Sequence, residues 1–216
     1  SGAKYDDLPI IASKILWDEK VTLQTLHNLQ DITTMFELLG SMGSEILLDE
    51  DMNFTIASHS LSDIEARYEL VKTMRASILV LGPLVAKYGK ARIALPGGCA
   101  IGSRPVNYHL DALKQMGAKI VLKNGYIEAS AKKLLGASIK FDGVTVTGTE
   151  NIMMAATLAK GTTVLTNVAK EPEIIDLADM LITMGAKIDG AGSDKIIIEG
   201  VDNLKGTEFY IPADRI

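Results

Sequence analysis

The chain carries one cysteine, Cys99, in a glycine-rich segment that ends with an arginine and a proline. Residues 95–105 read LPGGCAIGSRP, with Arg104 five positions after Cys99. Glycine permits positive φ angles and a close approach of the backbone to a ligand, and the arginine fork suits phosphate or carboxylate. A thiol beside such an anion site can act as a general acid or a nucleophile. The alternative is that Cys99 is a small buried side chain, as most free cysteines are, and its exposure decides between the two.

The segment after Cys99 predicts an anion site at the start of a helix. Arg104 precedes Pro105, which restricts it to an extended conformation, and Pro105 suits the first turn of a helix that ends near Met116. A cation at a helix N-terminus has no favourable interaction with the helix dipole, whereas the free amides of the first turn attract anions. We therefore expect an anion between Arg104 and this helix.

Two further segments have both a functional and a structural interpretation. Arg75 lies in an apolar stretch expected to be helical over residues 74–84, where a buried arginine needs an ion-pair partner. Residues 144–149 read VTVTGT and predict a strand-to-helix loop whose hydroxyls can donate to phosphate or uracil. Thr149 with Asn151 is equally an ordinary helix-start signal.

A repeat organises the chain. Met-Gly pairs at 42–43, 116–117 and 184–185 are separated by 74 and 68 residues, and each closes an amphipathic helical stretch. A strand pattern (residues 21–26, 91–96 and 162–168) precedes each of these helices, and an earlier helix (8–16, 68–88 and 149–160) precedes each strand. Two further strands follow each Met-Gly: 45–48 with 54–57, 119–122 with 126–129, and 187–188 with 195–198. The second pair is joined at Asn124-Gly125, a hairpin signal.

These patterns predict an α/β fold of three similar units, at about residues 5–66, 67–145 and 146–212. We expect the units to be related by an approximate threefold axis, with the helices at 8–16, 68–88 and 149–160 forming a shared core.

Composition excludes several classes of protein. A net charge of −5 over 216 residues argues against a general nucleic-acid binder. No apolar run is long enough for a transmembrane helix, and a single cysteine cannot form an internal disulfide. We expect a soluble enzyme domain of the reducing cytoplasm, without a cofactor, a metal or a membrane partner.

Several segments resemble one known family in its order along the chain. They are residues 1–4 (SGAK), 68–77 (YELVKTMRAS), 95–109 (LPGGCAIGSRPVNYH), 145–156 (TVTGTENIMMAA), 171–175 (EPEII) and 213–216 (ADRI). Together they resemble the UDP-N-acetylglucosamine enolpyruvyl transferases of bacterial peptidoglycan synthesis. The cysteine loop and KTMRAS are specific to that family, whereas SGAK or EPE alone is weak.

The resemblance implies an inside-out α/β barrel of three βαβαββ repeats, as in EPSP synthase, and this chain would be one of the family's two domains. The family transfers the enolpyruvyl group of phosphoenolpyruvate to the 3-hydroxyl of UDP-N-acetylglucosamine and releases phosphate. This is the first committed step of cell-wall synthesis, on which cell shape and division depend, and the cysteine is the target of fosfomycin. Because the family's catalytic base lies in the other domain, we expect this chain alone to be inactive.

The resemblance also assigns roles to individual residues. Cys99 corresponds to the catalytic thiol. The remaining matches are substrate-binding positions: Lys4 for the phosphoenolpyruvate phosphate, Tyr5 at a sugar-contacting position, Arg75 for the nucleotide sugar, Arg104, Pro105, Val106, Asn107 and Tyr108 around the diphosphate, His109, and Thr145 and Val146 for the uridine. Without the resemblance, Lys4 would be an ordinary solvated lysine and His109 could equally be a core residue.

The chain departs from the family at three places. Tyr5-Asp6-Asp7 replaces an asparagine and two alanines, which places negative charge near the expected phosphate site. Asn107 replaces an aspartate, and Gly143 stands where some relatives have a lysine.

Two other functions remain open from the sequence. The chain could be a non-catalytic fragment or a nucleotide-sugar-binding module. The related shikimate-pathway enolpyruvyl transferases share the fold, but they lack the cysteine loop.

Overall fold

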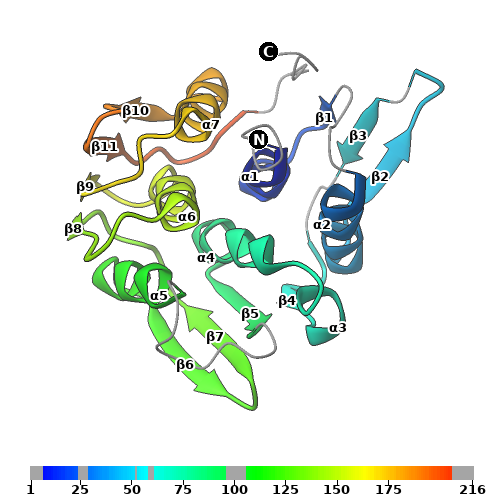
Figure 1. Cartoon of the computed structure of the whole chain (residues 1–216), viewed down its shortest axis with the longest axis horizontal. Coiled ribbons are helices and arrows are strands. Elements are labelled where there is room, and N and C mark those ends of the chain that lie inside the picture. Colours follow the sequence, from blue (N-terminus) through cyan, green and yellow to red (C-terminus); the bar gives the residue numbers. More distant parts are fainter. Residues whose placement is uncertain (1–6, 24–28, 52, 58–60, 96–105, 206–216) are drawn as a thin grey trace.

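Three small sheets surround a central group of helices in the computed structural model (Figure 1). The structure describes residues 7–23, 29–51, 53–57, 61–95 and 106–205. The α/β class and the three-unit arrangement predicted from the sequence are confirmed. The boundaries given for the three units stay a prediction.

The sheets share one strand order. The first contains β1 (Val21–Leu23), β3 (Phe54–Ala57) and β2 (Glu45–Leu48), in that order and all antiparallel. The second runs β4 (Glu65–Ala66), β5 (Lys90–Ala94), β7 (Tyr126–Ser130) and β6 (Lys119–Lys123). The third runs β8 (Ser138–Lys140), β9 (Thr162–Thr166), β11 (Lys195–Glu199) and β10 (Lys187–Asp189).

The strand patterns of the sequence are confirmed to within a residue or two where the structure describes them. The sequence analysis missed β4 and β8, which pair in parallel with β5 and β9 at the sheet edges. Both are too short, at two and three residues, to show a clear alternation of apolar and polar side chains.

The helices form an inner and an outer group. The inner group contains three helices, α1 (Asp7–Ser13), α4 (Leu81–Tyr88) and α6 (Val146–Ala156), which meet at the centre of Figure 1. The 3₁₀ turn η1 (Lys14–Leu16) follows α1, and the 3₁₀ helix η2 (Arg75–Val80) precedes α4. The outer group is α2 (Leu29–Met42), α5 (Val106–Gln115) and α7 (Pro172–Thr183); the short α3 (Tyr68–Val71) lies beside β4.

The Met-Gly repeats end the outer helices in the same way. Each methionine is buried, and glycines 43, 117 and 185 have φ of 117°, 92° and 105°. In all three, the amide after the glycine donates to a carbonyl five residues earlier, as in the bonds from Ser44 to Leu39, Ala118 to Leu113 and Ala186 to Leu181. This is the Schellman ending, which favours glycine because its left-handed conformation is costly for residues with a Cβ.

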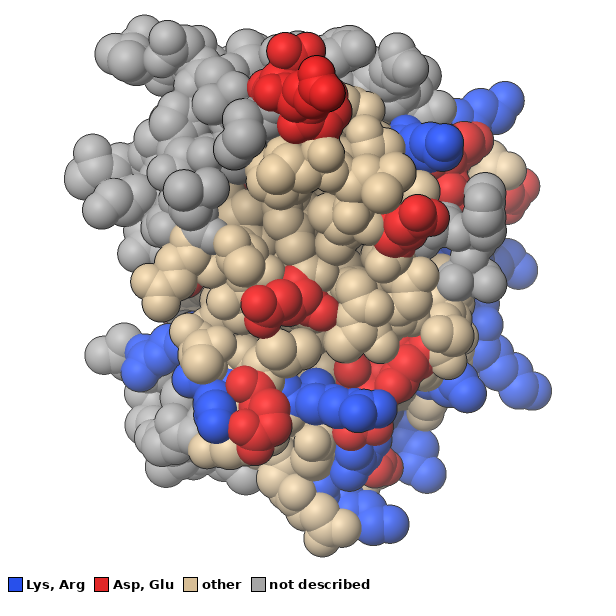
Figure 2. All heavy atoms as spheres, turned by 90° about the vertical axis from the view of Figure 1, so that its right-hand side faces the viewer, with Lys and Arg blue, Asp and Glu red and all other residues tan. Residues whose placement is uncertain are grey.

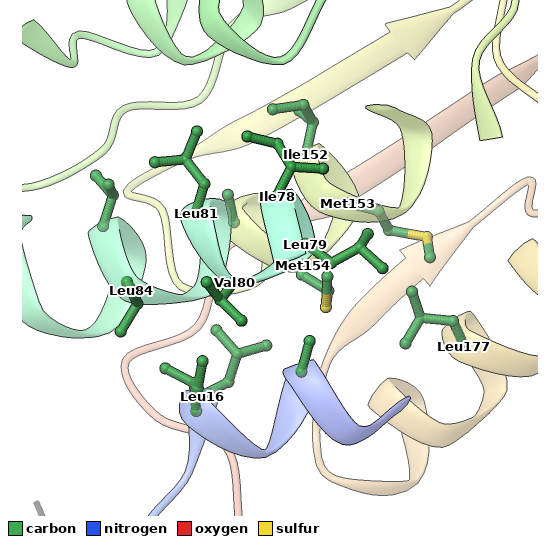
Figure 3. Close-up of a cluster of buried hydrophobic side chains, with 14 of the residues drawn as sticks. Leu16, Ile78, Leu79, Val80, Leu81, Leu84, Ile152, Met153, Met154 and Leu177 are labelled. Atoms are coloured by element: carbon green, nitrogen blue, oxygen red, sulfur yellow. The ribbon is translucent and has the colours of Figure 1, made fainter. Parts of the chain in front are cut away.

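Buried aliphatic side chains fill the space between the inner helices. Figure 3 shows Leu79 and Val80 of η2 beside Met154 of α6, with Leu84 of α4, Leu16 of η1 and Leu177 of α7 around them. The labelled residues are at most 6% exposed. This cluster joins all three units in one hydrophobic core.

The helix predicted over residues 68–88 is wrong as a single element. Met74 separates α3 from η2, because it adopts an extended conformation with φ −146° and ψ 109°, whereas η2 continues directly into α4. The break lets Met74 be buried while Lys72 and Arg75 stay exposed. Residues 77–80 of η2 are all buried, so this segment is surrounded by protein rather than amphipathic.

The helix predicted over residues 149–160 begins earlier than expected. Thr145 is the N-cap of α6, and its Oγ1 accepts a hydrogen bond from the Gly148 amide at 3.1 Å. The interpretation of Thr149 and Asn151 as a helix start is therefore wrong, and both side chains are buried inside the fold.

The surface carries charges of both signs. Figure 2 shows the face with α2 and the first sheet, where acidic side chains are scattered over an uncharged centre and basic ones gather toward the lower and right margins. Within the described ranges, no helix has the length and apolar character needed to cross a membrane.

Candidate functional site

The structure brings together two segments that are predicted to bind substrate. The first turn of α5 carries Val106, Tyr108 and His109, and the first turn of α6 follows Thr145. His109 Nε2 lies 3.4 Å from the Oγ1 of Thr147, which links the two helix starts directly. The first turns of two helices therefore lie close together, with the Thr147 hydroxyl at their contact, and helix N-termini attract anionic ligands.

His109 is a core residue as well as a neighbour of this site. It is 1% exposed, and its Nδ1 lies 2.9 Å from the Asn151 side-chain nitrogen. Burial lowers the pKa of His109 to about 4, because the charged imidazolium loses its hydration. The imidazole is therefore neutral at physiological pH and serves as a fixed hydrogen-bonding group.

Asn151 connects this histidine to the inner helices. Its side-chain nitrogen donates to the Ile78 carbonyl at 2.9 Å, and its side-chain oxygen accepts from the Gly82 amide at 2.7 Å. Sequence reasoning missed this network. The one available signal was a polar residue in the middle of a helix, next to the apolar run IMMAA, which requires a buried partner.

Tyr108 and Asn107 occupy different environments in the first turn of α5. Asn107 is exposed, whereas Tyr108 is half-buried and packs over Gly143 in the loop between β8 and α6. A side chain at position 143 would require the Tyr108 ring to move. Gly143, which stands where some relatives have a lysine, leaves this space to Tyr108.

Thr145 and Val146 lie at the beginning of α6. Thr145 is 6% exposed and caps the helix, while Val146 is half-buried and the preceding Val144 is 60% exposed. Thr149 stabilises the first turn of α6, because its Oγ1 donates to the Thr145 carbonyl at 2.7 Å and accepts from the Ala169 amide at 3.1 Å. The uridine-binding roles of Thr145 and Val146 stay predictions.

Arg75 lies away from these helix starts in the sequence and is exposed at the first position of η2. The alternative that it forms a buried ion pair is wrong, since it makes none with any residue that the structure describes. An exposed guanidinium can bind an anionic ligand. Lys72 is exposed and pairs with Glu69 at 2.7 Å.

Five predicted site residues lie outside the described residues. They are Lys4, Tyr5, Cys99, Arg104 and Pro105. Their roles stay predictions from the sequence.

Two hollows flank the end of β8, close to this region. One of about 360 Å³ lies under Tyr108 and is bordered by Asp111, Lys114 and Lys140. The other, of about 620 Å³, is bordered by Lys140, Asn167 and Lys195. In the parts of the chain that the structure describes, no group of histidine, cysteine, aspartate or glutamate side chains could hold a metal ion.

Comparison with known proteins gives the family. A family model described as EPSP synthase (3-phosphoshikimate 1-carboxyvinyltransferase) matches residues 1–216. The chain is 56% identical over its whole length to a UDP-N-acetylglucosamine 1-carboxyvinyltransferase of Magnetococcus marinus, and 55% identical to one of Ruthia magnifica. It spans about half the length of these relatives, 52% in each case.

Solved structures agree on the fold. The enolpyruvyl transferase NikO from Streptomyces tendae superimposes with a TM-score of 0.81 at 20% identity, covering 98% of this chain and 50% of its own. An EPSP synthase from Acinetobacter baumannii gives 0.74 at 19% identity, covering 96% of this chain and 48% of its own. The resemblance drawn from the cysteine loop and the other motifs is confirmed, and the chain belongs to the EPSP synthase family of enolpyruvyl transferases.

Proposed function

We propose that this chain supplies one half of an enzyme that transfers the enolpyruvyl group of phosphoenolpyruvate to the 3-hydroxyl of UDP-N-acetylglucosamine. The observation that carries the proposal is the identity of 55–56%, over the whole chain, to relatives named as that carboxyvinyltransferase. The cysteine loop at residues 95–105 favours this substrate over shikimate 3-phosphate. The step belongs to bacterial peptidoglycan synthesis in the cytoplasm.

The reaction is an addition followed by an elimination. The methylene carbon of phosphoenolpyruvate takes a proton and becomes a methyl group, C2 becomes oxocarbenium-like, and the sugar hydroxyl attacks C2 and loses its proton. Phosphate then leaves, and the methyl group loses a proton to form the enolpyruvyl double bond. Cys99 is placed as the general acid or as a nucleophile at C2, since a thiol with an ordinary pKa stays largely protonated at neutral pH. Lys4 and Arg104 stabilise the phosphate as its charge changes.

In this proposal, the residues at the first turns of α5 and α6 bind the nucleotide sugar. The diphosphate lies at the first turn of α5, near Val106, Asn107 and Tyr108, and the uridine lies near Thr145 and Val146 at the start of α6. The closeness of these two helix starts, through the 3.4 Å contact of His109 with Thr147, supports this placement. Arg75 supplies a further cation to the nucleotide sugar.

The complete site also needs groups from the other half of the enzyme, including the family's aspartate base. We therefore expect this chain alone to bind UDP-N-acetylglucosamine weakly and to release no phosphate from phosphoenolpyruvate. The acidic Asp6 and Asp7 weaken its phosphate site further, because they repel the anion.

A chimera tests the proposal. This chain replaces the matched half of the Magnetococcus marinus relative, and phosphate release is measured with phosphoenolpyruvate and UDP-N-acetylglucosamine. We expect turnover by the chimera, and its loss in the matched variant Cys99→Ala. Turnover with shikimate 3-phosphate instead of the nucleotide sugar would contradict the proposal, and so would a folded chimera without activity.

A further inference from the structure

The Asn151 side chain has one orientation that satisfies all its neighbours. Its oxygen must face the Gly82 amide at 2.7 Å, because an amide nitrogen there would place two donors against each other. Its nitrogen then donates one hydrogen to the Ile78 carbonyl and the other to His109 Nδ1, both at 2.9 Å. The side chain is completely buried and its polar atoms are satisfied, so the orientation is fixed by the packing of three helices.

This orientation determines which nitrogen of His109 carries the proton. Because Nδ1 accepts a hydrogen from Asn151, a neutral imidazole must carry its own hydrogen on Nε2. The same burial that keeps the ring neutral also removes water as a competing partner. His109 Nε2 is therefore a donor toward Thr147 Oγ1, 3.4 Å away.

A donor at this position controls the hydroxyl of Thr147. The oxygen accepts from His109, so the hydroxyl hydrogen cannot point toward the imidazole. Thr147 Oγ1 makes no other hydrogen bond with the residues that the structure describes. Thr147 is partly exposed in the first turn of α6, directly after Thr145 and Val146, and its hydroxyl hydrogen has no acceptor among the residues that the structure describes.

We propose that Thr147 is a further substrate-binding residue whose hydroxyl donates to an acceptor oxygen of the nucleotide, and that Asn151 is the positioning residue that sets this polarity through His109. The inference rests on the proposed function, because the nucleotide sugar supplies the acceptor. The acceptor is a uracil carbonyl oxygen or a phosphate oxygen that lies next to the start of α6.

Variants of Thr147 and Asn151 distinguish the role of the Thr147 hydroxyl from the positioning role of Asn151. Thr147→Val removes the hydroxyl while keeping the volume, and Thr147→Ser keeps the hydroxyl. Asn151→Asp replaces the donor toward Nδ1 with a carboxylate oxygen, an acceptor that requires a hydrogen on Nδ1 of His109. In the neutral imidazole, Nε2 then becomes an acceptor for the Thr147 hydroxyl, and long-range ¹H–¹⁵N spectra distinguish this form from the imidazolium. In the double variant Asn151→Asp/Thr147→Val the hydroxyl is absent, so the His109 tautomer can no longer affect binding through residue 147.

Two measurements on the chimera described above read out these effects. Long-range ¹H–¹⁵N spectra identify the protonated imidazole nitrogen of His109, and calorimetry gives the Kd of UDP-N-acetylglucosamine. We expect the Nε2–H tautomer in the unmodified protein and Nδ1–H in Asn151→Asp. Thr147→Val should weaken binding about five-fold, as for one lost hydrogen bond, while Thr147→Ser should bind as the parent does.

The double variant shows whether Asn151 acts through Thr147. Asn151→Asp should weaken binding in the parent background and cause no further weakening in the Thr147→Val background. A purely structural role of Asn151 predicts equal losses in both backgrounds and would overturn the positioning role. If Asn151→Asp does not fold, Thr147→Val and the tautomer of the parent still decide the inference.

The outcomes distinguish this inference from the proposed function. If the parent binds UDP-N-acetylglucosamine and Thr147→Val binds equally well, Thr147 is no donor and the inference alone is wrong. An Nδ1–H tautomer in the parent would also overturn it. If the folded parent does not bind the nucleotide sugar at all, the proposed function fails, and the inference fails with it.

Discussion

The hydroxyl oxygen of Tyr108 lies 2.5 Å from the position that a Cβ would occupy at Gly143. The Tyr108 side chain therefore lies against the backbone at Gly143, where an added Cβ would require the phenol to move. This contact joins the first turn of α5 to the loop before α6, and so it helps to set the spacing of the two helix starts at the candidate site.

We expect Gly143→Ala to destabilise the protein by about 1–3 kcal/mol, because the added methyl group forces Tyr108 away. The size of Tyr108 is the cause, so the additional change Tyr108→Leu should recover most of the loss. Urea unfolding of the two single variants and the double variant measures this coupling. Equal destabilisation by Gly143→Ala in both backgrounds would show that Tyr108 is not the obstacle.

A second prediction concerns the close packing of α4 on α6. A Cβ at Gly82 would clash with both the side-chain oxygen and the backbone carbonyl of Asn151, whereas a Cβ at Gly40 in α2 meets nothing within 4 Å. Gly82→Ala should therefore lower the free energy of unfolding by about 1–3 kcal/mol. Gly40→Ala, the matched helical control, should raise it by up to about 1 kcal/mol through helix propensity. Thermal or urea unfolding of both variants decides, and a stabilising Gly82→Ala would contradict the packing described here.

His109 should make the protein less stable in acid. Its pKa is about 4 in the folded state against 6.5 for the free side chain, so the unfolded chain binds the proton more readily between these values. The free energy of unfolding includes the full contribution of neutral His109 above pH 6.5. This contribution is lost as the pH falls toward 4. The loss amounts to about 3 kcal/mol, since one pKa unit corresponds to about 1.4 kcal/mol.

The matched variant for this prediction is His109→Gln, which keeps an acceptor for Asn151 but does not titrate. Unfolding free energies are measured for both proteins from pH 7 to pH 4, and their difference isolates the histidine from the carboxyl groups. A constant difference across this range would mean that His109 is protonated as easily in the folded state as in the unfolded state.

Lys14 should have an effect of the same sign at high pH, because burial lowers its pKa as well. Its amino group is buried beside Trp17 and donates to the Trp17 carbonyl at 2.8 Å. Burial lowers its pKa from 10.5 to about 8, against the opposing attraction of Asp18 and Glu19. The folded state therefore loses this proton first, and the contribution of Lys14 to stability should rise between pH 8 and pH 10.5.

Unfolding experiments at pH 7.5, 9 and 10 test this with Lys14→Met. The rise should disappear in that variant and persist in Lys72→Met, which removes an exposed lysine whose pKa is raised by Glu69. If Lys14→Met and Lys72→Met follow the same pH profile, the amino group of Lys14 is not desolvated in the folded protein.

The sequence alone determined the features that depend on local backbone preferences. The Met-Gly pairs predicted the helix endings, because a glycine with positive φ and a buried apolar neighbour is a local requirement. The turn at Asn124 and Gly125, with φ of 52° and 78°, confirms the predicted hairpin for the same reason. Sequence motifs also identified the family, since the cysteine loop needs no coordinates to be read.

The tertiary structure decided what depends on contacts between distant segments. Met74 leaves the helical conformation because its side chain is buried, and this divides the predicted helix at residues 68–88. The two-residue strand β4 exists because β5 provides its hydrogen-bond partner. The polar network at the candidate site arises in the same way: Asn151 is 42 residues from His109 and 69 from Gly82, so its partners are brought to it only by the packing of α4, α5 and α6. Local propensity carries no information about such pairs, because their free energy is gained only when the helices are already together.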